Sequence, residues 1–189
     1  SRDCYVYPAK DVIFFSADIH GNTIIRDRLR IIRRILENRP VTVVASLDGG
    51  LDRVLPLVFI RKNIMTVTAG ERYDLEELIK KLTQLGYERQ SQVESPGEFA
   101  VRGGILDIFP LTEEAPYRIE FWDDEIDSIR TFDVNSQRSI ENVERMDIYP
   151  AAEIILDESV KNAGLRRITL EEKEYEKALR SQFKTEEAA

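Results

Sequence analysis

The sequence predicts two styles of fold in one chain: a partial parallel α/β lobe over residues 1–67 and a compact α+β module over 68–150. Before residue 68, short apolar runs alternate with amphipathic helical patterns, as in parallel α/β sheets. After Gly70, one helix is followed by short strands separated by turn residues, which is typical of a mainly antiparallel sheet. The charge balance changes at the same place. Residues 1–70 hold 11 of the 27 basic and 7 of the 35 acidic groups, so the remainder holds 16 and 28.

The lobe begins with an apolar run at 12–15 and continues with a helix over 22–37. Asn22 is a good helix cap because its side chain can accept from the free amides of the first turn. Apolar residues then recur at helical spacing until Pro40 ends the pattern. These residues are Ile24, Ile25, Leu29, Ile32, Ile35 and Leu36.

Two further strands complete the expected lobe. Residues 41–45 are apolar except for Thr42, which predicts a strand buried on both faces of a parallel sheet. A break at Gly49-Gly50 precedes a short helix around Leu51, Val54 and Leu55. Residues 64–68 read as the next strand.

The module opens with a helix whose first turn is a capping box. Asp74 caps the helix, Glu77 reaches back, and Gly86 ends it. Its apolar stripe consists of Leu75, Leu78, Ile79, Leu82 and Leu85. The strands expected after it are Tyr87–Val93, Glu98–Arg102, Ile105–Phe109, Tyr117–Trp122, Ile126–Phe132 and Val143–Tyr149.

Residues 151–189 do not predict an independent domain. Residues 171–178 form a charged helical pattern, and 184–189 have the composition of a frayed end.

Composition excludes several functional classes. One cysteine (Cys4) and one histidine (His20) cannot build a Cys/His zinc site or a disulfide framework. No apolar run approaches the roughly 20 residues needed to span a bilayer, and no signal segment opens the chain. We therefore expect a cytoplasmic protein without membrane, metal or cofactor. The first residue is Ser rather than Met, which suggests a piece of a longer protein.

Two charged clusters invite a functional interpretation. Five arginines between 26 and 34 could contact phosphates of DNA, or could form a solvated helix face paired with Asp27 and Glu37; no aromatic residues interleave to stack on bases, which favours the second. The run 123–125, Asp-Asp-Glu, superficially resembles a metal-binding acidic site. The sequence has no phosphate-binding G-x-x-x-x-G-K-S/T motif, so these acids are better explained as a turn. No catalytic residues are predicted.

The strand 117–122 offers a possible binding face. Side chains alternate along a strand, so Arg118, Glu120 and Trp122 point to one side, with Arg118 and Trp122 about 13 Å apart. Arginine and tryptophan are frequent at interface hot spots. Equally, Trp122 could lie under a loop or helix, with Arg118 paired to nearby acids.

Residues 86–138 closely resemble a known family. The segments Ser95–Pro110, Tyr117–Arg130 and Ser136–Arg138 are similar to the UvrB-like N-terminal region of bacterial transcription-repair coupling factors (Mfd). The segments 16–36 and 44–47 resemble the first lobe of that region.

The resemblance implies a fold, a partner and a site. Residues 1–67 would be half of a degenerate helicase-like lobe, 68–150 an inserted module that binds UvrA, and 151–189 the start of the returning lobe. In the family, two arginines and one aromatic residue contact UvrA, and these fall on Arg102, Arg118 and Trp122. At the position of Trp122 the family usually has Phe. With Glu120 from the same strand face, these form the expected UvrA site. The remaining partner would be the rest of the coupling-factor chain, an ATP-dependent DNA translocase. The alternative partner is DNA, contacted weakly through the helix 26–34.

Overall fold

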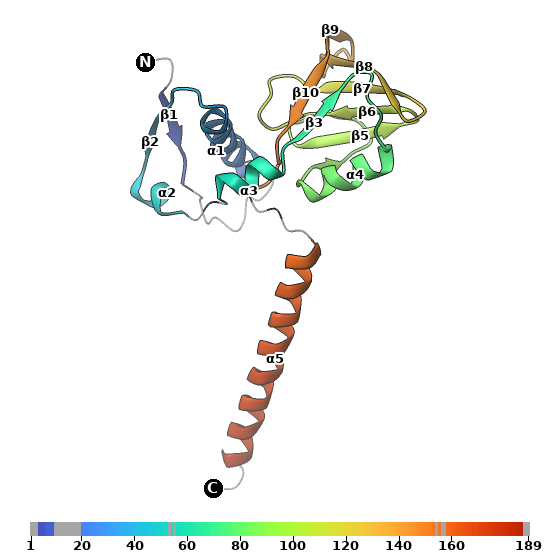
Figure 1. The fold of residues 1–189 in the computed structure, drawn as a ribbon. Coiled ribbons are helices and arrows are strands. Elements are labelled where there is room, and N and C mark those ends of the chain that lie inside the picture. The colour runs from blue at the N-terminus through green and yellow to red at the C-terminus, as the bar shows by residue number, and fades with distance from the viewer. Residues whose placement is uncertain are drawn as a thin grey trace. The chain divides into compact units, whose positions relative to one another are not determined.

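The computed structural model describes residues 4–9, 20–52, 54, 56–153, 155 and 158–186 (Figure 1). The chain divides into two units, the first ending at Ile155 and the second containing a single long helix. The first unit mixes helices with a mainly antiparallel sheet, which confirms the predicted combination of fold classes.

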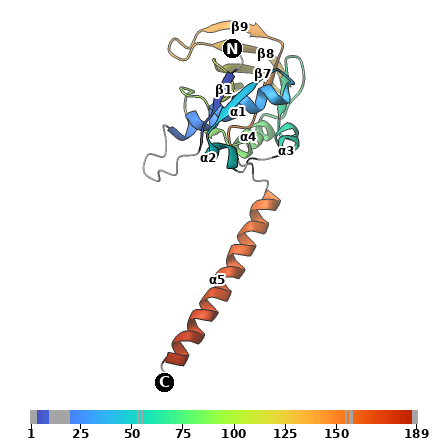
Figure 2. The same cartoon turned by 90° about the vertical axis from the view of Figure 1, so that its left-hand side faces the viewer.

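The lobe contains a parallel pair of strands and three helices. Its elements are β1 (Cys4–Tyr7), α1 (His20–Leu36), β2 (Thr42–Ala45), α2 (Leu47–Leu51) and α3 (Leu57–Lys62). Strands β1 and β2 run parallel in the register Cys4–Thr42 to Tyr7–Ala45, as the α/β pattern predicts. Helix α1 lies beside β1 (Figures 1 and 2), and the guanidinium of Arg34 lies 5.0 Å from the ring centre of Tyr5. The apolar run expected at 12–15 lies outside the described residues.

Several local expectations for the lobe are wrong. Helix α1 begins at His20, so Asn22 lies inside the helix and is not its cap. The short helix covers Leu47–Leu51 and contains the glycine pair that the sequence suggested as a break. Ser46 caps it, accepting from the Gly49 amide at 3.2 Å. Gly49 packs closely against β1, since a Cβ there would lie 3.2 Å from the Tyr7 carbonyl oxygen. Helix α3 was not predicted.

The two predicted lobe strands also differ from expectation. All four residues of β2 are exposed rather than buried on both faces, because β1 is its only partner among the described residues. Strand β3 (Met65–Thr68) does not join this parallel pair. It pairs antiparallel with β10 (Arg145–Ile148), in the register Met65–Ile148 to Thr68–Arg145. An apolar pattern predicts a strand but does not choose the strand's partner.

The module is built on a six-stranded sheet in sequential order (Figure 1). Its strands are β4 (Glu88–Arg89), β5 (Glu98–Arg102), β6 (Ile105–Ile108), β7 (Tyr117–Trp122), β8 (Glu125–Phe132) and β9 (Ser139–Val143). Every neighbouring pair is antiparallel except β4 and β5, which run parallel. The expected strand 87–93 is therefore mostly irregular. Strand β9 was missed because it is an exposed edge strand without a buried apolar face.

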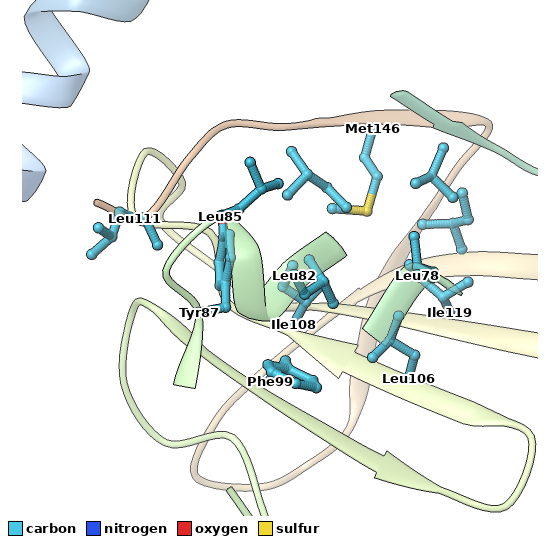
Figure 3. Close-up of a cluster of buried hydrophobic side chains, with 14 of the residues drawn as sticks. Leu78, Leu82, Leu85, Tyr87, Phe99, Leu106, Ile108, Leu111, Ile119 and Met146 are labelled. Atoms are coloured by element: carbon cyan, nitrogen blue, oxygen red, sulfur yellow. The ribbon is translucent and has the colours of Figure 1, made fainter. Parts of the chain in front are cut away.

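Helix α4 (Leu75–Gln84) lies against one face of this sheet. Asp74 caps it as predicted, accepting from the amides of Glu76 and Glu77 at 2.8 and 3.2 Å. Glu77 pairs with Lys81, and Gly86 ends the helix with φ +91°. The main core lies between α4, the β3–β10 pair and the sheet (Figure 3). Its members labelled there are Leu78, Leu82, Leu85, Tyr87, Phe99, Leu106, Ile108, Leu111, Ile119 and Met146.

The second unit is helix α5 (Glu158–Glu186), which is longer than the predicted helical stretch 171–178. Of the expected frayed end, residues 184–186 belong to the helix and 187–189 lie outside the described residues. Among the described helices, none has the length and hydrophobicity of a membrane span.

Candidate protein interaction surface

The face of the sheet opposite α4 carries a cluster of charged side chains. The register places Asp107 of β6 opposite Arg118 of β7, and Arg118 opposite Arg130 of β8. One step along, Arg102 of β5 lies in the row that contains Ile105 and Glu120. We call Arg102, Asp107, Arg118, Glu120 and Trp122 the charged face. Residues between them, such as Leu106 and Ile119, point into the core and are fully buried.

Asp107 is the centre of this face. Its side chain is 1% exposed, and it accepts hydrogen bonds from two arginines on neighbouring strands. Arg118 binds it through both Nε (2.7 Å) and Nη2 (2.9 Å). Arg102 donates from Nη2 to the same carboxylate at 2.8 Å. A buried carboxylate is costly unless it is paired, so the two guanidiniums stabilise its charged form in the sheet.

Arg118 is further enclosed by other groups. Its Nη1 donates to the Gln137 carbonyl oxygen at 3.3 Å, and its Nη2 donates to the Gln137 Oε1 at 3.1 Å. The guanidinium lies 4.5 Å from the ring centre of Phe132. The hydrogen bonds to Asp107 raise the pKa of Arg118 above its usual range, so it is charged under all physiological conditions. Its side chain is only 15% exposed, compared with 49% for Arg102.

Glu120 belongs to a second charged pair on the same face. It forms an ion pair with Arg130, and Ser128 Oγ donates to its other carboxylate oxygen at 3.2 Å. The side chains of Glu120 and Arg130 are each about one-third exposed. Glu120 is therefore held in place at the border of the face.

Trp122 is the most exposed large apolar residue described in the chain, at 81%. The irregularity in pairing after Glu120 falls in β8, where Asp127 is the additional residue, so β7 keeps its alternation. Phe121 accordingly packs against the core, and Trp122 lies on the side of Glu120 and Arg118. The sequence left open whether Trp122 is exposed or covered; in the structure it is exposed. The ion pairing of Arg118, proposed in the same alternative, is also present.

The arginine-rich helix α1 is bound to carboxylates rather than presented as a free basic surface. Arg28 is fully buried and pairs with Asp52 at 2.8 Å and Glu153 at 2.6 Å. Arg33 bridges Glu37 and Glu113 at 2.7 and 2.5 Å. Arg26 and Arg30 also form ion pairs, with Asp27 and Glu114. Both predicted local partners, Asp27 and Glu37, are found. Most of the carboxylates that pair with these arginines, however, come from residues distant in sequence.

Of the acidic run 123–125, Asp123 and Asp124 form the turn between β7 and β8, and Glu125 is the first residue of β8, paired with Trp122. Asp123 adopts φ +60°, and the Asp124 carbonyl accepts from the Tyr73 amide at 2.8 Å. Arg72 forms an ion pair with Asp124 at 3.7 Å. Asp123 and Asp124 thus have the turn role favoured by the sequence, whereas Glu125 belongs to the strand. In the part of the chain that the structure describes, no three His, Cys, Asp or Glu side chains are grouped to hold a metal ion.

Two comparisons with known proteins place this surface in a family. A family model described as the UvrB interaction domain matches residues 65–154, which include the whole charged face. The chain is 38% identical to a transcription-repair-coupling factor of Staphylococcus aureus (strain USA300) over 160 residues. It is 37% identical to that of Bacillus subtilis (strain 168) over 168 residues. These matches are consistent with a segment of a transcription-repair-coupling factor.

The match covers most of this chain but little of its relatives. It includes 85% of the chain for the S. aureus protein and 88% for the B. subtilis protein. In both cases it spans 14% of the relative's length. These matches confirm the resemblance seen in residues 86–138, and the match to an interaction domain points to a protein–protein surface.

Sequence reasoning did not single out Asp107 and Gln137. Asp107 carried a usable signal, since it is the one charged residue in the strand Ile-Leu-Asp-Ile and shares a face with Ile105. Gln137 carried none, because it contacts Arg118 from a turn 19 residues away.

Proposed function

We propose that this chain is a recruitment module that binds UvrA and so couples stalled transcription to nucleotide excision repair. The observation that carries the proposal is the exposed Trp122 beside Arg102 on one face of a rigid sheet. In this proposal Arg102, Arg118, Glu120 and Trp122 form the binding surface. The chain would be one part of a larger ATP-dependent DNA translocase, with the motor located elsewhere and no catalytic residues in this segment.

The chemistry of the charged face supports this role. An exposed tryptophan is unfavourable for solubility and is a typical anchor at the centre of a protein interface. Arg102 is half exposed and lies about 12 Å from Trp122, by strand spacing and rise. An arginine can bind a partner carboxylate through two hydrogen bonds, and these strengthen as the tryptophan excludes water. Arg102 is a basic position in a region that carries excess negative charge.

The domain organisation that we propose has three parts: the partial lobe 1–67, the interaction module 68–150 and the returning segment 151–189. A start at residue 65 for the module is preferable to 68, because β3 pairs with β10 and a cut inside β3 would separate them.

Binding to UvrA can be measured by calorimetry and by the fluorescence of Trp122, the only tryptophan of the chain. Burial of the indole in an interface shifts its emission to shorter wavelength. Trp122→Ala and Arg102→Ala are each expected to weaken binding by about 1–3 kcal/mol. Trp122→Phe is expected to keep most of the affinity, and provides the spectral blank for tryptophans of UvrA.

Tyr175→Ala is the matched control, because Tyr175 is an aromatic residue, 68% exposed, on α5. It should bind UvrA like the wild type. If Trp122→Ala and Arg102→Ala also bind like the wild type while remaining folded, the proposed site is wrong. If duplex DNA binds instead, with affinity that falls steeply between two salt concentrations, the alternative role of helix 26–34 is favoured. The ion pairs of α1 argue against that outcome, since the arginines would have to exchange carboxylates for phosphates.

A further inference from the structure

We infer that Asp107 is a positioning residue for the binding surface and that Arg118 acts with it, so that only Arg102 and Trp122 bear the main direct contacts. This inference rests on the proposed binding of a protein partner to the charged face. It divides the five residues of the charged face into Arg102 and Trp122, which touch the partner, Glu120 at the border, and the pair Asp107 and Arg118, which holds Arg102 in place.

Asp107 cannot itself reach a partner. Its carboxylate is 1% exposed, and it lies in the middle of the sheet between Ala100 and Arg118 in register. Arg102 is two residues beyond Ala100 on β5, and its long side chain reaches diagonally to Asp107. Any effect of Asp107 on binding must therefore pass through the arginines.

Arg118 and Arg102 differ in how many of their N–H donors are already used within the sheet. A guanidinium has five N–H groups in a fixed fork. Arg118 uses Nε, Nη1 and Nη2 in four hydrogen bonds to Asp107 and Gln137, and Phe132 covers its plane. Little of it remains for a partner. Arg102 makes a hydrogen bond to Asp107 through Nη2, while its Nε and Nη1 have no hydrogen bond among the described residues.

The contact with Asp107 also affects how much conformational entropy Arg102 loses on binding. A mobile arginine must lose rotamer freedom when it binds, and this loss weakens association. The contact with Asp107 restricts Arg102 before binding, while the side chain as a whole is half exposed. Arg118 completes the arrangement because it fixes both oxygens of Asp107. Removal of the Asp107 charge should therefore weaken binding by a factor on the order of three to ten.

The test is a double-mutant cycle with UvrA as the titrant. Asp107→Asn keeps the shape of the side chain and removes its charge. If Asp107 acts through Arg102, Asp107→Asn weakens binding three- to tenfold in the wild-type background and has almost no effect in the Arg102→Ala background. Glu141→Gln, an equal change of charge at an exposed position of β9, is the control and should leave affinity unchanged.

A second variant guards against loss of folding. Asp107→Asn leaves Arg118 without its carboxylate, so Asp107→Asn/Arg118→Met removes both buried charges together and retains packing on Phe132. Thermal unfolding of each variant, followed by circular dichroism, verifies the fold. The double variant should bind as weakly as Asp107→Asn alone.

The inference is overturned if folded Asp107→Asn binds like the wild type, or if its effect persists undiminished in the Arg102→Ala background. Failure of the proposed function looks different. In that case the wild-type chain does not bind UvrA, or Arg102→Ala and Trp122→Ala bind it normally. A result in which Asp107→Asn is silent while these two variants are impaired refutes the positioning role alone.

Discussion

Gly86→Ala is expected to be one of the most damaging single-methyl substitutions in the chain. Gly86 ends α4 with φ +91°, and a Cβ placed on it would lie 2.6 Å from the Cβ of Ala152 and 3.2 Å from the Ala152 nitrogen. The chain cannot easily withdraw there, because the Ala151 amide donates to the Leu85 carbonyl at 2.8 Å. The substitution therefore combines backbone strain with a steric clash at a packed junction.

The magnitude can be estimated from these two components. Positive φ costs a non-glycine residue about 1–2 kcal/mol, and overpacking a tight site costs about 1–3 kcal/mol. Alanine recovers about 0.4–1 kcal/mol by restricting the unfolded chain. The free energy of unfolding should thus fall by about 1–5 kcal/mol, a large share of the roughly 5–15 kcal/mol typical of a domain.

Urea denaturation followed by circular dichroism measures this change, and Gly70→Ala is the matched control. Gly70 has a similar φ of +81°, but no atom lies within 4 Å of its hypothetical Cβ. Both variants share the backbone strain, so the difference between them isolates the clash with Ala152 and should be about 1–3 kcal/mol. If Gly86→Ala is no less stable than Gly70→Ala, the reasoning about this junction is refuted.

Two further predictions concern buried polar groups. Arg28→Ala removes a fully buried cation from between Asp52 and Glu153. It should lower the free energy of unfolding, measured by urea titration, by about 3–5 kcal/mol. A loss below about 1 kcal/mol, the value expected for a surface ion pair, would contradict this prediction. Burial raises the pKa of Tyr87 above its ordinary value of 10.0, so its contribution to stability is fully present below pH 10 and is lost as pH rises further. Unfolding free energies measured on both sides of pH 10 should show this decline, and it should be shallower in Tyr87→Phe, which also loses the hydrogen bond to the Tyr149 carbonyl.

Local signals in the sequence were reliable where the local chain decides the structure. The cap Asp74 and the terminator Gly86 bound α4 as predicted, because side-chain capping and positive φ are properties of a few neighbouring residues. The alternation along 117–122 placed Ile119 in the core and Trp122 on the opposite face for the same reason.

The pairing of segments distant in sequence was harder to predict. The strand at 65–68 has an apolar pattern that suits several partners, and only the folded chain brings β10 alongside it. The edge strand β9 has no buried face to reveal it. The glycines at 49 and 50 suggest a break in secondary structure. In the structure both lie in α2, where Gly49 packs closely against the backbone of Tyr7.

The sequence by itself determined the mixed fold class, the limits of α4, the resemblance to transcription-repair-coupling factors and the face that carries Arg118, Glu120 and Trp122. These depend on periodicity, capping and motifs, which are written in consecutive residues. Only the tertiary structure decided that Trp122 is exposed, that Arg118 is enclosed, and that Asp107 joins Arg102 to Arg118. Such facts depend on strand register and on a turn that brings Gln137 to the sheet, and no pattern of neighbouring residues encodes which distant groups will meet.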